Sequence, residues 1–305
     1  MFDFIGKKSR FFIISGIVIL IGIISLASFG LKAGIEFSSG SQLTLKFENE
    51  VEITELRQEM GDLGYDNAIV QKTGGGDFII RTALLTAEEK TQLKTDLEGS
   101  FGALEEEGFV NVDPITAGQT VNIAAIAVAI AAVGIMLYVT WAFRRMPKPF
   151  RYGTCAIIAL LHDTVVALGI FSIIGGIMGW EINLMFITGT LAVIGYSVNN
   201  TVVIFDRIRE NLIHHPSSDF KTVVNNSLVE SLTRSINTSL TTIIVVLALL
   251  LFVGSTIQNF AVVLLIGIIA GTFSSLFIAP SLLVVWEDGG WRRYFRWLSS
   301  IKSGR

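Results

Sequence analysis

Six apolar segments, each long enough to cross a bilayer as a helix, dominate this chain of 305 residues. About 20 mostly apolar residues span roughly 30 Å of hydrocarbon, because a backbone in lipid must satisfy its own hydrogen bonds. Hydrophobic residues make up 51% of the chain and charged residues only 16%, which excludes an ordinary soluble enzyme. We therefore predict an α-helical, multi-pass membrane protein. The predicted spans cover approximately residues 11–29, 121–143, 153–179, 182–205, 236–254 and 257–286.

Four groups of lysine and arginine residues lie on one side of these spans. They occur before the first span and in the segments 143–152, 206–235 and 289–305, whereas the short loops 175–181 and 254–257 contain neither residue. Cytoplasmic loops are enriched in Lys and Arg, so both termini and the loop 206–235 are predicted to be cytoplasmic. The first span is interpreted as a retained signal anchor, and a cleaved signal peptide is the alternative.

Residues 30–118 form the one sizeable polar segment, which this orientation places outside the cytoplasm. The segment carries seven Lys and Arg against seventeen Asp and Glu, a net charge of −10, while the rest of the chain carries +7. Such an acidic domain is not typical of proteins that bind nucleic acid or anionic lipid. The remaining boundaries are 1–29 for the N-terminus and first span, 119–288 for spans two to six, and 289–305 for a basic tail.

The polar segment has the sequence pattern of a small α+β domain. Apolar alternation and helical spacing predict the order β-α-β-β-α-β, and Thr86 and Glu89 have the form of a capping box that opens the second helix. This order is that of a ferredoxin-like fold, which many unrelated functions share. The acidic run at residues 105–107 is interpreted as a solvated face or loop.

Polar side chains interrupt the fourth predicted span. Thr188, Ala192, Gly195 and Asn199 recur at i, i+4, i+7 and i+11 and form a stripe of small and polar residues. Tyr196 and Asn200 form an i, i+4 pair beside this stripe. Amides in hydrocarbon cost several kcal/mol unless they are hydrogen-bonded, so these residues must face protein or water.

Two ionisable residues accompany the amides. Asp163 lies inside the third span, and Arg234 precedes the unusually polar start of the fifth. An ionisable residue in a membrane is a functional-site candidate. Counted from the cytoplasmic ends, Asp163, Asn199, Asn200 and Arg234 are predicted to share one depth in a polar interhelical cavity. The alternative is that these groups hold helices together and that Arg234 extends to the interface.

Other residues have simpler interpretations. Asp206, Arg207 and Glu210 are interpreted as a solvated helix end, and Gly267 and Gly271 as a close-packing face of the sixth span. The single cysteine and three histidines provide no disulfide and no metal-site spacing, and the sequence contains no Walker loop or set of nucleophile, base and orienting residue. We predict no enzymatic activity, no cofactor and no metal.

The segment GYSVNNTVVIFDRIREN at residues 195–211 resembles the fourth-span signature of SecF in the SecD/SecF family of protein-export membrane proteins, part of the RND transporter superfamily. Five further segments resemble this family in the same order: residues 3–12, 31–43, 160–173, 232–242 and 264–283.

This resemblance implies a subunit of the bacterial cytoplasmic (inner) membrane that works with SecD and the SecYEG channel. Its implied role is to use a proton or sodium motive force to promote late translocation of an unfolded preprotein. Membrane lipid is a further implied partner, and nucleic acid is not one. Six spans are one half of an RND-like arrangement, so SecD is expected to supply the other half.

The chain departs from the family pattern at two places. The family has Asn-Asp where this chain has Asn199-Asn200, and the family's fifth-span arginine corresponds to Arg234. Because Asn200 cannot ionise, three explanations are open: a SecD carboxylate carries the proton, Asp163 has taken part of the role, or Asn200 is an introduced replacement that imitates the protonated acid. At residues 36–40 the family has Asp and a Gly-Gly pair, and we expect little functional change from this difference.

Two alternative functions remain at this stage. One is half of an RND-type exporter of small molecules or lipids, which would need a larger outer domain. The other is a structural scaffold of the translocon.

Overall fold

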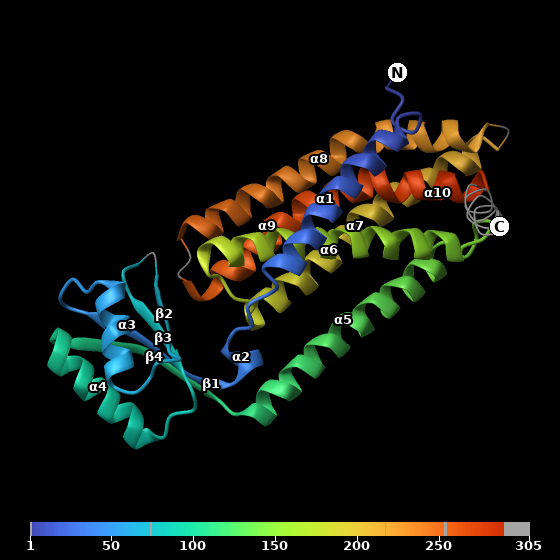
Figure 1. Cartoon of the computed structure of the whole chain (residues 1–305). Coiled ribbons are helices and arrows are strands. Elements are labelled where there is room, and N and C mark those ends of the chain that lie inside the picture. Colours follow the sequence, from blue (N-terminus) through green and yellow to red (C-terminus); the bar gives the residue numbers. More distant parts are fainter. Residues whose placement is uncertain (1, 74, 217, 253–254, 290–305) are drawn as a thin grey trace, which may run out of the picture.

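The computed structural model describes residues 2–73, 75–216, 218–252 and 255–289 and contains six helices long and apolar enough to cross a membrane (Figure 1). The predicted multi-pass fold is thus confirmed. The membrane helices are α1 (Lys8–Ser28), α5 (Pro114–Ala142), α6 (Phe150–Met178), α7 (Leu184–His214), α8 (Phe220–Phe252) and a last span made of α9 (Ser255–Phe273), the π-helical turn η1 (Ser274–Ile278) and α10 (Ala279–Glu287). Residues 290–305 of the predicted basic tail lie outside the described residues.

The prediction of a loop over residues 206–235 is wrong for most of that segment. Helix α7 continues to His214 and α8 begins at Phe220, which leaves a short connector. The segment lacks a helix-breaking residue before Pro216, and apolar side chains at helical spacing, among them Ile208 and Leu228, are buried between the two helices. The helices therefore project beyond the apolar part of the bundle as a paired hairpin.

The polar segment folds into the predicted α+β domain. Its elements are β1 (Gly40–Phe47), α3 (Ile53–Asp62), β2 (Ile69–Lys72), β3 (Phe78–Thr82), α4 (Ala87–Phe101) and β4 (Leu104–Val112), preceded by the short α2 (Ile35–Ser38). The sheet order is β2-β3-β1-β4 and every pairing is antiparallel, which confirms the ferredoxin-like interpretation. The Thr86–Glu89 capping box is also confirmed. Leu43, Leu45 and Ile80 of the sheet pack against α3 and α4.

The acidic run at residues 105–107 lies in strand β4 and not in a loop. Glu105 and Glu107 are exposed, as a solvated face requires, whereas Glu106 is partly buried between Lys90 and Lys94 of α4, at 2.5 and 2.9 Å. The hydrogen bond from Lys90 holds the pKa of Glu106 below its ordinary value. The middle residue of the run thus fastens α4 to the edge of the sheet.

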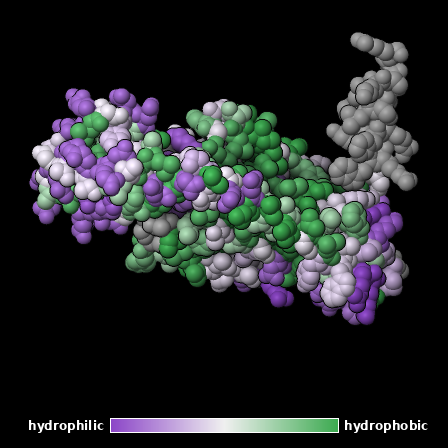
Figure 2. Space-filling view, turned by 90° about the horizontal axis from the view of Figure 1, so that it is seen from below, coloured by the Kyte–Doolittle hydropathy of each residue, from purple (hydrophilic) through white to green (hydrophobic). Residues whose placement is uncertain are grey.

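The membrane bundle has a buried centre and exposed outer helices. Half or more of the apolar part of α6, α7 and the last span is buried, against 6% for α5. Helix α5 diverges from the others toward the sheet domain (Figure 1). A broad apolar band separates the polar sheet domain from the polar opposite end (Figure 2). This belt matches a bilayer, and almost no residue in the apolar part of α5 is fully buried.

Candidate functional site

Small residues bring α7 and α9 into close contact. A Cβ atom added to Gly267 would lie 2.1 Å from a methyl group of Val193, and one added to Gly271 would lie 3.0 Å from Ser197 Cβ. The two predicted packing glycines of the last span therefore lie against α7. Gly195 differs: it is exposed, and no atom lies within 4 Å of where its Cβ would be. It contributes no packing within the described chain.

This close approach places a buried carboxylate among hydroxyl groups. Asp163 of α6 is only 1% exposed. Its Oδ2 accepts hydrogen bonds from Ser197 Oγ of α7 at 2.5 Å and Ser274 Oγ of η1 at 2.7 Å. Its Oδ1 lies 2.9 Å from Nδ1 of His162. Three elements of the bundle thus converge on one side chain.

The neighbouring amide is also satisfied from the last span. Asn200 is 8% exposed, and its Nδ2 donates to Ser275 Oγ at 2.7 Å. Tyr196 donates to Ser239 Oγ at 3.0 Å, and Thr272 Oγ1 lies 2.7 Å from the same hydroxyl. Sequence reasoning identified only glycines of the last span as a packing face. The position of Ser274 and Ser275 three and four residues after Gly271 was the signal that they approach α7.

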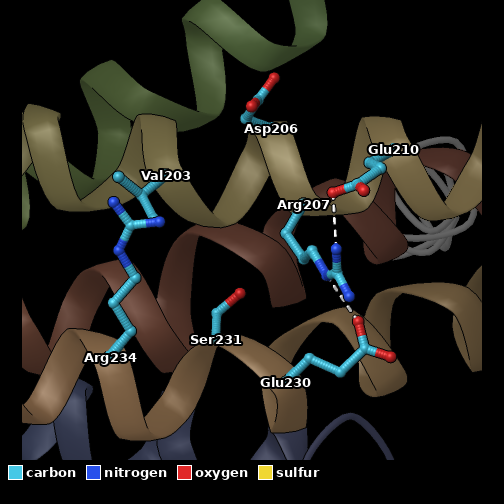
Figure 3. Close-up of a pocket in the computed structure, with 7 residues that line it drawn as sticks. All are labelled: Val203, Asp206, Arg207, Glu210, Glu230, Ser231 and Arg234. Carbon is cyan, nitrogen blue, oxygen red and sulfur yellow. Dashed lines mark hydrogen bonds and ion pairs between the residues drawn. The ribbon is translucent and has the colours of Figure 1, made fainter.

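Asn199 and Arg234 do not join this cluster, and the prediction of one shared cavity is wrong in that respect. Both side chains are exposed, and neither forms a hydrogen bond or ion pair with another described residue. The guanidinium of Arg234 extends toward Val203 of α7 (Figure 3). The reason is that successive side chains point in directions about 100° apart around the helix axis. Asn200 therefore faces the core, and Asn199 faces outward with Thr188, Ala192 and Gly195.

Asp206, Arg207 and Glu210, which the sequence predicted at a solvated helix end, form surface ion pairs. Arg207 bonds to Glu210 at 2.6 Å and Glu230 at 2.7 Å, and Asp206 bonds to Arg209 at 2.7 Å. Asp206, Arg207, Glu210 and Glu230 line an open pocket of about 350 Å³ between α7 and α8, together with Val203, Ser231 and Arg234 (Figure 3). Exposed ion pairs of this kind stabilise little. Among the described residues, no three His, Cys, Asp or Glu side chains gather as a metal site requires.

Comparison with known proteins agrees with this architecture. The family model "Protein export membrane protein SecD/SecF, C-terminal" matches residues 92–289, and the "SecD/SecF GG Motif" model matches residues 24–51. The chain belongs to the SecD/SecF family.

Two curated relatives align over nearly the full length of this SecD/SecF family member. The protein translocase subunit SecF of Thermobaculum terrenum is 41% identical, and that of Anaerolinea thermophila is 39% identical; each alignment covers 97% of both chains. The crystal structure of SecDF from Thermus thermophilus superposes with a TM-score of 0.82 at 29% identity, over 94% of this chain and 39% of that chain. The protein is therefore similar to the SecF part of a larger SecDF chain.

The GG-motif segment of this SecD/SecF family member forms the root of the sheet domain. A Cβ on Gly34 would lie 2.6 Å from the carbonyl oxygen of Ile182, and Gly40 has φ +120°. Ser39 takes the first position of the family's Gly-Gly pair, and its φ is +63°. A non-glycine residue there is strained, so the departure at residues 36–40 has a conformational cost that sequence reasoning did not anticipate.

Glu181, in the connector between α6 and α7, joins the sheet domain to the outer end of the bundle. It forms an ion pair with Arg81 of β3 and accepts a hydrogen bond from Gln71 of β2 at 3.2 Å. Arg81 also donates to Ser38 Oγ at 2.8 Å, and Asn259 of α9 donates to the Glu181 carbonyl at 2.8 Å. Sequence reasoning missed this contact because its two charged residues are 100 positions apart.

Burial raises the pKa of Glu181, and the opposing effect of Arg81 is smaller. Gln71 and Arg81 of the sheet domain contact this carboxyl, so docking of the domain contributes to its burial and favours the protonated form. This contribution to docking is fully present below about pH 4, near the ordinary pKa of an exposed Glu. It is lost as the pH rises through the raised pKa of the docked state.

We accordingly expect lower pH to favour the docked arrangement of the sheet domain. Glu181→Gln should remove this pH dependence and keep the contact, because its amide oxygen still accepts from Gln71. Arg81→Met should loosen the contact at every pH. Spin labels at exposed Glu98 and Leu251 would measure the separation of domain and bundle. An unchanged distance distribution in Arg81→Met would contradict the docking role.

Proposed function

We propose that the chain is a SecF subunit that joins SecD and uses a proton motive force to promote late preprotein translocation through SecYEG. It lies in the bacterial cytoplasmic membrane, with both termini cytoplasmic and the sheet domain outside. The observation that carries this proposal is the exposed polar face of α7 and α8: Asn199 and Arg234 lie outward and without a partner in the described chain. A lone polar face of this kind requires a second bundle.

The physical reason is the cost of polar groups in lipid. An exposed amide or guanidinium in the apolar band costs several kcal/mol unless it meets protein or water. A SecD half packed on α7 and α8 would cover both groups and enclose a polar path between the halves. The SecDF protein of Bacillus subtilis supports this pairing. It is 34% identical over 93% of this chain, and the match covers only 38% of that longer protein, so most of the SecDF chain is left for the SecD half.

The proposed partner would also supply the ionisable carboxyl group that Asn200 lacks. Asn200 cannot ionise, and its amide already bonds to Ser275. A carboxylate from SecD would therefore be the group that pairs with Arg234. One proton crossing 100 mV releases about 2.3 kcal/mol, which biases two conformations whose free energies differ by a similar amount.

The test is preprotein export in energised vesicles that contain SecYEG, with SecD and this chain added together or separately. We expect stimulation only when both are present, and loss of stimulation when a protonophore collapses the proton gradient. Stimulation that survives the protonophore would instead indicate a scaffold. Efflux of small molecules or lipids without any effect on preprotein would indicate an exporter half.

A further inference from the structure

His162 and Asp163 are adjacent titratable residues at the middle of α6, and both are buried. His162 is 8% exposed and Asp163 is 1% exposed. Asp163 lies thirteen residues after Phe150, the first residue of the helix, which corresponds to about 20 Å along the axis. The pair therefore lies deep in the apolar band, where each charge must be stabilised by direct contacts.

Both carboxylate oxygens of Asp163 have close polar partners. Ser197 and Ser274 both donate to Oδ2, and His162 Nδ1 lies 2.9 Å from Oδ1. The two oxygens thus have three polar atoms at hydrogen-bond distance. With Nδ1 as the third donor, the remaining ring nitrogen of His162, Nε2, carries a lone pair.

That nitrogen is the unsatisfied atom of the group. Nε2 of His162 is buried and has no hydrogen-bond partner among the described residues. The imidazole lies beside Phe273, with ring centroids 6.3 Å apart. A buried acceptor left without a donor is destabilising, because it has lost its hydrogen bond to water. Uptake of one proton changes the pair from a net charge of −1 to an imidazolium facing a carboxylate, and a low-dielectric environment favours this neutral pair.

Within the described residues, the spans packed on α6 carry no other charged side chain near this pair. The helices packed around α6 carry no Asp, Glu, Lys, Arg or His in residues 11–28 of α1, 114–143 of α5 and its end, 184–205 of α7, or 255–286 of the last span. On α8, Arg234 is exposed and lies on the opposite, outward face. The nearest charged groups on those elements, such as Lys8 and Glu287, lie at their ends.

We propose that His162 and Asp163 together form a proton-binding site inside this chain, separate from the exposed Asn199 and Arg234 face. The proton enters at Nε2, and the two residues titrate as one coupled unit. A hard cation such as sodium would need several free oxygen ligands, whereas both hydroxyls here already donate to Asp163 and the free atom is a nitrogen. The use of this site in export depends on the proposed function, but its proton binding does not.

The last span gives the site a connection to Asn200. Ser274 and Ser275 are consecutive residues of η1, and they bond to Asp163 and Asn200 respectively. π-helical turns occur preferentially at functional sites. A proton bound to the His162–Asp163 pair weakens the hydrogen bond from Ser274 to the carboxylate. Because Ser275 adjoins Ser274, a shift of Ser274 also alters the hydrogen bond between Ser275 and the Asn200 amide, which lies beside the polar face.

The experiment is a pH titration of the full chain in lipid nanodiscs, with ¹⁵N-labelled histidine observed by NMR. His214→Gln and His215→Gln leave His162 as the single reporter, since the chain has three histidines. We expect the neutral ring to carry its proton on Nδ1 and to ionise in one step. Asp163→Asn should move that step to lower pH by about one unit or more. Ser274→Ala, which removes a donor to the carboxylate, should move it to higher pH, and the buried Ser281→Ala is the matched control.

A ring that remains neutral from pH 4 to pH 9, or a titration that is the same in all variants, would overturn the proposal. A step that moves on exchange of potassium for sodium would overturn it in favour of a sodium site. If His162 titrates as expected while His162→Gln leaves proton-driven export unchanged, the site stands and its role in the proposed function fails. If the titration is absent but export with SecD still depends on the proton gradient, only the inference about this pair fails.

Discussion

Replacing Gly267 with valine is expected to disrupt the membrane bundle. Even the first added carbon would lie 2.1 Å from a Val193 methyl, and Val193 is short, β-branched and buried, so it has no space into which to move. Separating α7 from α9 would also break the bonds to Asp163. We expect a loss of about 3 kcal/mol in the free energy of unfolding, measured by denaturant unfolding of the chain in detergent.

Two further variants isolate the cause. Gly134→Val is the matched control, because Gly134 lies in an exposed part of α5 with no atom within 4 Å of its added Cβ, and it should leave stability nearly unchanged. Val193→Ala should partly rescue Gly267→Ala by clearing the methyl groups from the site. If Gly267→Val is as stable as the Gly134 variant, the close contact of α7 and α9 does not hold the bundle together.

Replacing Arg234 with alanine is expected to reduce export stimulation to the level measured without the chain, while the chain itself stays folded. The side chain makes no bond to another described residue, so its removal leaves the bundle contacts intact. It would remove a positive charge on the exposed face that a SecD carboxylate can meet. The measurement is preprotein export in energised vesicles, together with the amount of SecD that co-purifies.

Arg209→Ala serves as the control for Arg234. Arg209 is a partly exposed arginine that pairs with Asp206 at 2.7 Å and lies near the C-terminal end of α7. Its loss should leave export within a factor of two, because an exposed ion pair contributes about 0–1 kcal/mol. Loss of SecD from the purified Arg234→Ala complex would contradict the ion-coupling role and would show that Arg234 acts as an assembly contact.

The parts of the fold that were predictable depend on local sequence. Span length and the strand-helix order of residues 40–112 follow from apolar runs and periodicities within windows of about 20 residues. The continuation of α7 to His214 was missed because the charged residues 206–210 resemble a loop in composition, although their i, i+3 ion pairs belong to a helix.

The candidate site was less predictable because it depends on rotation and on distant partners. Asp163, Asn199, Asn200 and Arg234 were placed at one depth by counting residues, but counting does not determine which face of a helix meets which neighbour. Asn199 and Asn200 are adjacent in sequence and face opposite environments. The donors to Asp163 come from 34 and 111 residues away, and no local pattern specifies such pairs.

The connector that holds Glu181 has a mechanical consequence. It links the end of α6 to the start of α7, and these two helices carry Asp163 and Ser197. Fifteen residues of continuous helix, about 22 Å at 1.5 Å per residue, separate Asp163 from Met178. A force that pulls on the sheet domain while the Arg81–Glu181 pair stays closed therefore acts on the turn between α6 and α7. Because these two helices are continuous, we expect the force to reach the hydroxyl groups around Asp163.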